Sequence, residues 1–326
     1  MTTMSYAEAS AAALREAMRQ DPRVVVLGED VGRGGIFQQY LGLQAEFGAE
    51  RVIDTPISES AIAGGGVGMA LAGLRPVVEL RVVDFALCAM DEIVNQAAKN
   101  RFMFGGQGRV PVVLRMPIGM WTHSAAQHSQ SLEAWFAHLP GVTVMCPSTP
   151  QDNHVLLAQA LRGEDPVIYM EHKELWGVRG PVDPADAMPA GHARVLRRGA
   201  DVVLVAWSAA VPLAERAATE LAAQGIDAGV IDLRTLWPWD RETVLAEAAR
   251  TGHLLVVHES VQVAGFGAEV AASAAQHTGC RVGRLGAPRI PVGYAAALEA
   301  EARIGVPQIV AAAQALRSPN HRQTHA

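Results

Sequence analysis

The hydrophobic positions of the chain fall into short continuous runs that are separated by longer amphipathic stretches. Each run is rich in Val, Ile and Leu and is apolar on both faces; the first six occupy residues 23–27, 51–54, 76–80, 110–115, 142–145 and 166–170. Such strands are typical of a parallel sheet with helices on both faces, because every parallel crossover needs a helix. The pattern therefore predicts an α/β, doubly wound first domain.

A helix is predicted near the start of the chain. Ser5 and Glu8 have the spacing of a capping box, in which a hydroxyl and a carboxylate each satisfy a free backbone N–H. Residues 1–21 mix Glu8 with Arg15 and Arg19, unlike a signal or transit peptide, and no apolar run approaches the roughly 18 residues of a membrane span. We therefore expect a cytoplasmic protein without a membrane partner.

The alternation of strands and helices lapses between residues 181 and 200, which are rich in Pro and Gly. It resumes with predicted strands at 202–205, 229–233 and 254–257 and predicted helices near 213–223 and 241–249. We expect a first domain over 1–180, a linker over 181–200, a smaller doubly wound domain over 201–317 and a polar, disordered tail over 318–326.

The composition narrows the class of protein. Only 18% of the 326 residues are charged, against roughly 25% in an average soluble protein, so part of the surface is expected to lie against another chain. The net charge of −6, from 27 Lys and Arg against 33 Asp and Glu, lacks the basic excess that nucleic-acid binding needs. Cys88, Cys146 and Cys280 are too few and too far apart for a disulfide framework or a zinc knuckle.

Two local patterns concern the segment around residue 59. The glycines at 64–66 and 68 are not a dinucleotide fingerprint, because Met69 and Leu71 stand where the G-x-G-x-x-G spacing would need glycine. They predict a helix that packs closely at an interface. Glu59 precedes them, after a predicted strand end and a turn at Pro56, where ligands of open α/β sheets lie. A carboxylate that only interacts with a helix dipole is the alternative.

Five motifs follow one another along the chain: Val-Leu-Gly-Glu-Asp-Val at 26–31, Asp-Thr-Pro-Ile-Ser-Glu at 54–59, Asp-Glu-Ile-Val-Asn-Gln-Ala-Ala-Lys at 91–99, Ala-Gln-His-Ser-Gln at 126–130 and Gly-Phe-Gly-Ala-Glu at 265–269. Together they resemble the β subunit of the thiamine-diphosphate-dependent 2-oxoacid and acetoin dehydrogenases, over nearly the whole chain. The resemblance implies a transketolase-like pyrimidine-binding domain followed by a transketolase C-terminal-like domain. Residues 102–106 and 171–173 look closer to the acetoin branch.

The resemblance also implies roles for single residues. Glu59 would hydrogen-bond the pyrimidine ring of thiamine diphosphate and favour the imino tautomer that activates the thiazolium carbon. His128, expected at the start of a helix through 132–135, would be the active-site histidine, and Phe85 and Glu29 would lie on the cofactor side. A structural histidine, a core phenylalanine and a solvated turn residue stay open as alternatives for these three.

A partner chain is expected from what the sequence lacks. The relatives bind the diphosphate through magnesium held by a Gly-Asp-Gly segment, which is missing here. The resemblance therefore implies an α subunit that holds most of the magnesium ligands, a heterotetramer of two α and two β chains, a small oxo substrate and a lipoyl acyltransferase as acceptor. A potassium ion is implied at the carbonyls of Val112, Ala160, Leu161 and Gly163 and at Asp165, where an ordinary helix-ending turn is the alternative.

Two departures leave the substrate open between a 2-oxo acid and acetoin. Phe102 stands where relatives often have Tyr, and Arg81 stands where an apolar residue near the cofactor pocket is common in the pyruvate branch. For Arg81 two alternatives stay open: an ion pair with Asp84 or contact with a polar substrate. Two other functions also stay open. Beside the dehydrogenase subunit, one alternative is the small half of a split transketolase-like enzyme, and the other is a non-catalytic subunit that stabilises a partner.

Overall fold

The first helix forms as its capping pattern predicts. The computed structural model describes residues 1–318, and in it Ser5 and Glu8 form the capping box of α1 (Tyr6–Gln20). The preceding strand β1 (Thr2–Ser5) pairs antiparallel with β8 (Arg179–Val182). The chain divides into two units, residues Met1–Ala190 with Leu236–Pro238 and residues Gly191–Thr235 with Trp239–Ala326. Within 1–318, no helix has the length and apolar character that a membrane crossing needs.

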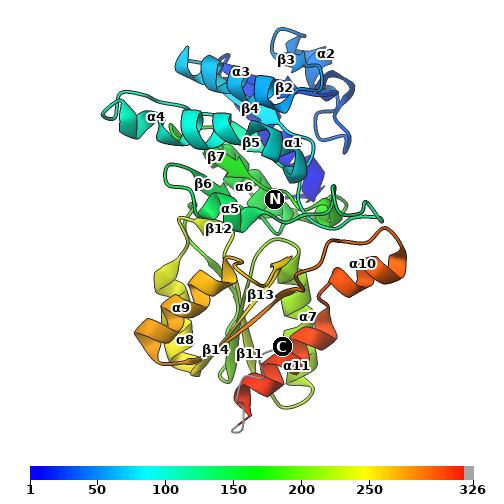
Figure 1. Cartoon of the computed structure of the whole chain (residues 1–326), viewed down its shortest axis with the longest axis vertical. Coiled ribbons are helices and arrows are strands. Elements are labelled where there is room, and N and C mark those ends of the chain that lie inside the picture. Colours follow the sequence, from blue (N-terminus) through cyan, green and yellow to red (C-terminus); the bar gives the residue numbers. More distant parts are fainter. Residues whose placement is uncertain (319–326) are drawn as a thin grey trace. The chain divides into compact units, whose positions relative to one another are not determined.

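The first unit is built on a seven-stranded sheet in the order β12-β6-β7-β5-β4-β2-β3 (Figure 1). Its strands are β2 (Val24–Gly28), β3 (Val52–Asp54), β4 (Arg75–Glu79), β5 (Val113–Arg115), β6 (Thr143–Met145), β7 (Val167–Tyr169) and β12 (Thr235–Trp237). The pairings among β2 to β7 are all parallel. Strand β5 begins later than the predicted start at residue 110, since Pro111 has no N–H to donate to a ladder.

Helices cover both faces of this sheet, which confirms the doubly wound prediction. Val77 of β4 packs in a core with α1 and α6 (Pro150–Ala160). Its neighbour Val78 points to the opposite face, where α3 (Glu59–Leu71) packs on the sheet. A Cβ on Gly66 of α3 would lie 2.4 Å from Cγ2 of Val78, so only glycine allows this approach.

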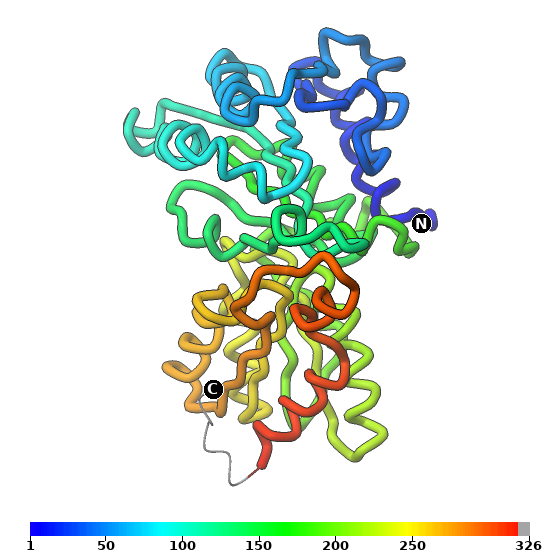
Figure 2. Tube along the Cα trace, turned by 45° about the vertical axis from the view of Figure 1, so that its right-hand side comes forward, coloured from blue at the N-terminus to red at the C-terminus, as the bar shows by residue number. Residues whose placement is uncertain are grey.

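The second unit is a five-stranded sheet in the order β14-β13-β10-β11-β9, and its course can be followed by colour in Figure 2. The strands are β9 (Arg194–Arg197), β10 (Val202–Ala206), β11 (Ala228–Asp232), β13 (His253–Val261) and β14 (Arg281–Ala287). Only β9 runs antiparallel, at the edge. The segment expected to be a linker, residues 181–200, thus contains β9 and the last two residues of β8.

Helices also cover both faces of the second sheet. On one face lie α7 (Ala210–Ala222) and α11 (Val306–Arg317), and on the other α8 (Arg241–Thr251) and α9 (Gly267–Thr278) (Figure 1). The short α10 (Ala296–Ala302) precedes α11. Ser318 caps the end of α11, and residues 319–326, which make up the rest of the predicted tail, lie outside the described part of the chain.

A buried histidine organises the interior of the second unit. His258 of β13 stacks on Trp207 with ring centroids 5.0 Å apart, and burial lowers its pKa to about 4. Gly265, Gly267 and Gly286 surround the ring so closely that a Cβ on any of them would lie within 2.7 Å of an imidazole atom. These glycines are therefore required by the histidine that they enclose.

Candidate functional site

The predicted site residues follow four adjacent strands of the first sheet. Strands β3, β2, β4 and β5 are parallel neighbours, so their carboxyl ends meet at one edge. The segments after them carry the residues Glu59, Glu29, Phe85 and His128 respectively. The chain adds β3 on one side of β2 and then β4 on the other side, so the direction in which strands are added reverses at β2. Ligands of open α/β sheets bind outside such a reversal point, at the carboxyl ends of the strands.

Glu59 is the first residue of α3 and is half-buried. The helix cap, Ser58, makes no side-chain capping bond, so the positive end of the helix dipole faces the region of this carboxylate. Among residues 1–318, no side chain pairs with Glu59. Its carboxylate is therefore available to hydrogen-bond a ligand.

Phe85 and His128 are brought into contact. Phe85 lies in the 3-10 segment η2 (Val83–Ala89), and its ring meets the imidazole edge to face with centroids 5.2 Å apart. His128 is exposed, and its backbone carbonyl accepts a hydrogen bond from the buried ammonium of Lys173. An aromatic face and an exposed imidazole thus lie side by side at this edge of the sheet.

The helix expected to begin at His128 begins later. The structure starts α5 at Glu133 and ends it at Ala137, and the preceding segment is a loop. That loop is fixed by side-chain and backbone bonds that a helix would not make: the amide of Gln130 donates to Asp84 at 2.7 Å, and its carbonyl accepts from Gly119 N–H at 3.0 Å. His128 is therefore positioned by these loop contacts and not by a helix terminus.

Glu29 is paired with the arginine that departs from the pyruvate branch. Oε2 of Glu29 lies 3.0 Å from Nη1 of Arg81, and the Glu29 side chain is 8% exposed. Arg81 has φ 48°, in the left-handed region that non-glycine residues rarely adopt. Because the two residues are 52 positions apart, neither spacing nor periodicity predicts the pair.

A buried polar network that sequence reasoning missed lies beneath this edge. Glu79 ends β4 and accepts a hydrogen bond of 2.5 Å from the hydroxyl of Tyr40, and its burial raises its pKa to about 7. Arg115 ends β5, forms a fully buried ion pair of 2.5 Å with Glu171 and stacks over Tyr40. The available signal was a charged residue at the carboxyl end of each of two neighbouring strands, Glu79 of β4 and Arg115 of β5.

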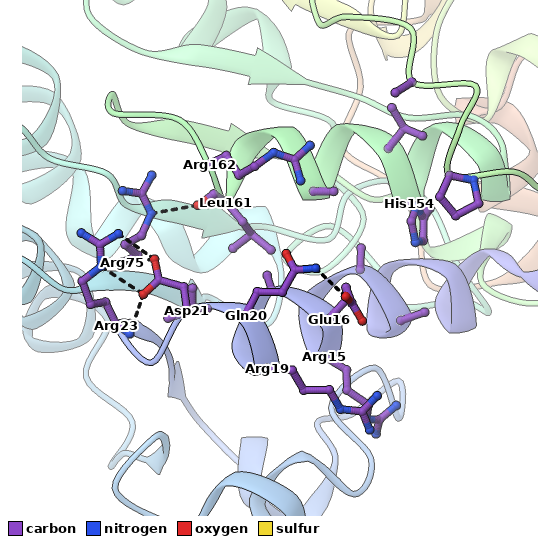
Figure 3. A pocket seen from close by; sticks show the side chains of 18 of the residues that line it. Arg15, Glu16, Arg19, Gln20, Asp21, Arg23, Arg75, His154, Leu161 and Arg162 are labelled. Atoms are coloured by element: carbon purple, nitrogen blue, oxygen red, sulfur yellow. Dashed lines mark hydrogen bonds and ion pairs between the residues drawn. The ribbon is translucent and has the colours of Figure 1, made fainter.

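The oxygen atoms predicted to bind potassium already have hydrogen-bond donors. The Arg75 guanidinium lies at one end of a pocket of about 750 Å³ between α1 and α6, where Nε donates to the Leu161 carbonyl at 2.9 Å (Figure 3). Arg75 also donates to the Gly163 carbonyl and pairs with Glu164 at 3.1 Å. A cation would therefore have to share these carbonyls with a guanidinium.

The other predicted ligands of the ion are also engaged. The carbonyls of Val112 and Ala160 accept from the N–H groups of Val167 and Gly163, at 2.9 Å and 3.1 Å, and the Asp165 carboxylate pairs with Arg101. Over residues 1–318, no three His, Cys, Asp or Glu side chains gather into a metal-binding group. The potassium site stays a prediction.

The chain matches two family models and many known proteins. Residues 2–178 match the transketolase pyrimidine binding domain, and residues 191–309 match the transketolase C-terminal domain. The chain is 43% identical to the 2-oxoisovalerate dehydrogenase subunit beta of Bacillus subtilis, over 92% of this chain and 94% of that protein. It is 42% identical to the acetoin:2,6-dichlorophenolindophenol oxidoreductase subunit beta of Cupriavidus necator, over 93% and 94%.

Two further relatives extend the comparison. The pyruvate dehydrogenase E1 component subunit beta of Rhizobium meliloti is 41% identical, over 97% of this chain and 70% of that protein. A solved structure described as a split gene transketolase, an inactive beta4 tetramer, superposes with a TM-score of 0.81 at 25% identity, over 97% of this chain and 99% of that one. The identity and coverage show that the chain belongs to the β-subunit family of the thiamine-diphosphate-dependent 2-oxoacid and acetoin dehydrogenase first component.

Proposed function

We propose that this chain is the β half of a heterotetrameric first component that cleaves the carbon–carbon bond of a 2-oxo acid or acetoin and passes the acyl group to a lipoyl acyltransferase. The observation that carries the proposal is the gathering of an available acid, an aromatic ring and an exposed imidazole after β3, β4 and β5, at the ligand-binding edge of the sheet. Thiamine diphosphate, when bound, supplies the electron sink for the cleavage.

The residues suit the pyrimidine side of that cofactor. The Glu59 carboxyl group would hold a proton at the ring nitrogen of the pyrimidine, and Phe85 would offer its flat face to the ring. His128, which contacts Phe85 and is exposed, would exchange protons with the oxygen of the reacting acyl group. Glu29 would support this site through Arg81.

The site requires a second chain. This sequence has no Gly-Asp-Gly segment to hold magnesium, so we assign the diphosphate end of the cofactor to an α subunit. The uncovered face of α3 supports such a partner, because a Cβ on Gly68 would meet open space and Leu71 is 51% exposed. Small residues of this kind allow a second helix to approach closely. A cytoplasmic location and the potassium ion remain predictions of the sequence.

Calorimetry tests the division of the site between two chains. The purified β chain, titrated with thiamine diphosphate and magnesium, is expected to show no tight binding, since at net charge −6 it offers little compensation for the diphosphate. Addition of the α subunit is expected to produce binding and substrate cleavage. Tight binding and 2-oxo acid decarboxylation by the β chain alone would overturn the proposal.

The transketolase alternative has weaker support. It rests on the fold similarity to the split gene transketolase at 25% identity, whereas the dehydrogenase subunits reach 41% to 43%. Ketol transfer between phosphorylated sugars would also need cations at the substrate end. The segments after β3 and β5, residues 55–74 and 116–142, contain no Lys or Arg, and Arg81, in the segment after β4, is already paired with Glu29.

A further inference from the structure

We infer that Arg81 selects a 2-oxo acid over acetoin by binding the substrate carboxylate, an inference that rests on the proposed function. Arg81 comes two residues after β4, and Glu29 comes one residue after β2. Strands β2 and β4 are hydrogen-bonded neighbours with Gly28 opposite Glu79, and the chain reverses its progress between them. The ion pair of Arg81 and Glu29 therefore spans the position at which ligands of this fold class bind.

The guanidinium of Arg81 has hydrogen-bond donors that the ion pair does not use. Its side chain is 30% exposed, whereas that of Glu29 is 8% exposed, so the arginine is the more accessible member of the pair. Guanidinium carries five N–H donors, and the ion pair uses Nη1. In the part of the chain that the structure describes, Arg81 makes no other polar contact. The remaining donors are available to a ligand.

The backbone of Arg81 supports a functional role. Its φ of 48° lies in the left-handed region that strains a non-glycine residue, and such strain concentrates at functional sites. The strained residue lies four positions before Phe85, which contacts His128. The strained residue thus stands in the same segment after β4 as Phe85, with its cation on Glu29.

The two substrate classes differ in charge at this position. A 2-oxo acid carries a carboxylate next to its reacting carbonyl, whereas acetoin is neutral. Planar guanidinium binds a carboxylate through two parallel N–H donors, an arrangement stronger than a neutral hydrogen bond. Arg33, in the segment after β2, is 84% exposed and paired with Asp30, so it lies on the surface and not against the buried Glu29. Arg81 thus offers a charge that complements the carboxylate of a 2-oxo acid and has no counterpart in acetoin. Because an apolar residue is common at this position in the pyruvate branch, the arginine adds a binding preference and is not a requirement of the cleavage itself.

Binding of two unreactive probes tests this selection. Oxamate has the shape and charge of a small 2-oxo acid, and oxamide is its neutral counterpart. In the α–β complex with thiamine diphosphate and magnesium, Arg81→Met is expected to weaken oxamate binding at least tenfold in calorimetry and to change oxamide binding less than twofold. Arg33→Met is the matched control and should leave both dissociation constants unchanged.

Kinetics and a second variant make the result decisive. Arg81→Met is expected to lower kcat/KM for 2-oxoisovalerate at least tenfold and for acetoin less than twofold. Arg81→Lys keeps a cation beside Glu29, so it controls for misfolding caused by loss of the ion pair. Its oxamate affinity should fall several-fold, because lysine lacks the planar pair of N–H donors. Equal losses of affinity for the charged and the neutral probe would overturn this inference and leave the proposed function unchanged. A wild-type complex that cleaves neither substrate class would overturn the proposed function and this inference with it.

Discussion

The imidazole of His128 lies edge-on to the ring of Phe85, with the two centroids 5.2 Å apart. The contact joins residues from the segments after β4 and β5, which are 43 positions apart in the chain (128 − 85 = 43). Edge-to-face contacts of this kind contribute about 0.5–1.5 kcal/mol beyond the buried area. The proposed proton carrier is therefore held by the ring proposed to pack on the cofactor, and the two roles are separable by mutation.

Substitution of His128 should affect acyl transfer more than cofactor affinity. His128→Ala in the α–β complex removes the imidazole but leaves the Phe85 face, so transfer to a lipoyl acceptor should fall roughly 100-fold or more while thiamine diphosphate affinity changes little. Phe85→Leu should weaken thiamine diphosphate affinity and change the transfer rate little. Stopped-flow transfer rates and calorimetry check this, and an unchanged transfer rate in His128→Ala would return the histidine to a structural role.

Glu59→Gln should slow activation of the cofactor without disturbing assembly. The amide cannot hold the proton that the carboxyl group would share with the pyrimidine nitrogen, so exchange of the thiazolium proton should slow by roughly 100-fold. Hydrogen–deuterium exchange of the bound cofactor, read by NMR, measures this. Glu220→Gln, on the exposed surface of α7, is the control. Wild-type exchange in a cofactor-saturated Glu59→Gln complex is the contrary result.

The first unit should lose stability as the pH rises from about 4.5 to 7. Burial raises the pKa of Glu79 from 4.5 to about 7, so the folded state favours the protonated acid and its advantage disappears as the carboxyl ionises. A difference of this size corresponds to roughly 3 kcal/mol at most. Amide exchange in β4 measures it, and Glu79→Gln should flatten the pH dependence. Identical slopes in both proteins would contradict the assignment.

Gly267→Ala should destabilise the second unit. The added Cβ would lie 2.7 Å from Nε2 of His258, whose ring is fully buried and stacked on Trp207. Overpacking of this kind typically costs about 1–3 kcal/mol. Faster amide exchange in α9 should reveal it. Gly177→Ala, where a Cβ meets open space, should cost less than about 0.5 kcal/mol, and equal effects of the two substitutions would argue against the steric explanation.

The strands, the helices and the edge of the sheet that carries the site could be predicted from the sequence, because they depend on patterns of neighbouring residues. Apolar strands alternating with helices predict a doubly wound sheet, and the order of the strands then carries Glu59, Phe85 and His128 to one edge. The roles of these residues came from motif resemblance. The pairs of Arg81 with Glu29 and of Tyr40 with Glu79 could not be predicted, since they join positions far apart in the chain whose contact depends on strand order.

Strand β12 has a consequence for dividing the protein. Residues Leu236–Pro238 belong to the first unit, although they follow strands β9, β10 and β11 of the second unit in the chain. A fragment that ends at residue 190 would keep β2 to β7 but lose the strand that covers β6. It would then expose unpaired N–H and C=O groups along β6, which invite pairing with other chains. The first unit should therefore aggregate when it is expressed as a contiguous fragment, and it is a folding unit only within the longer chain.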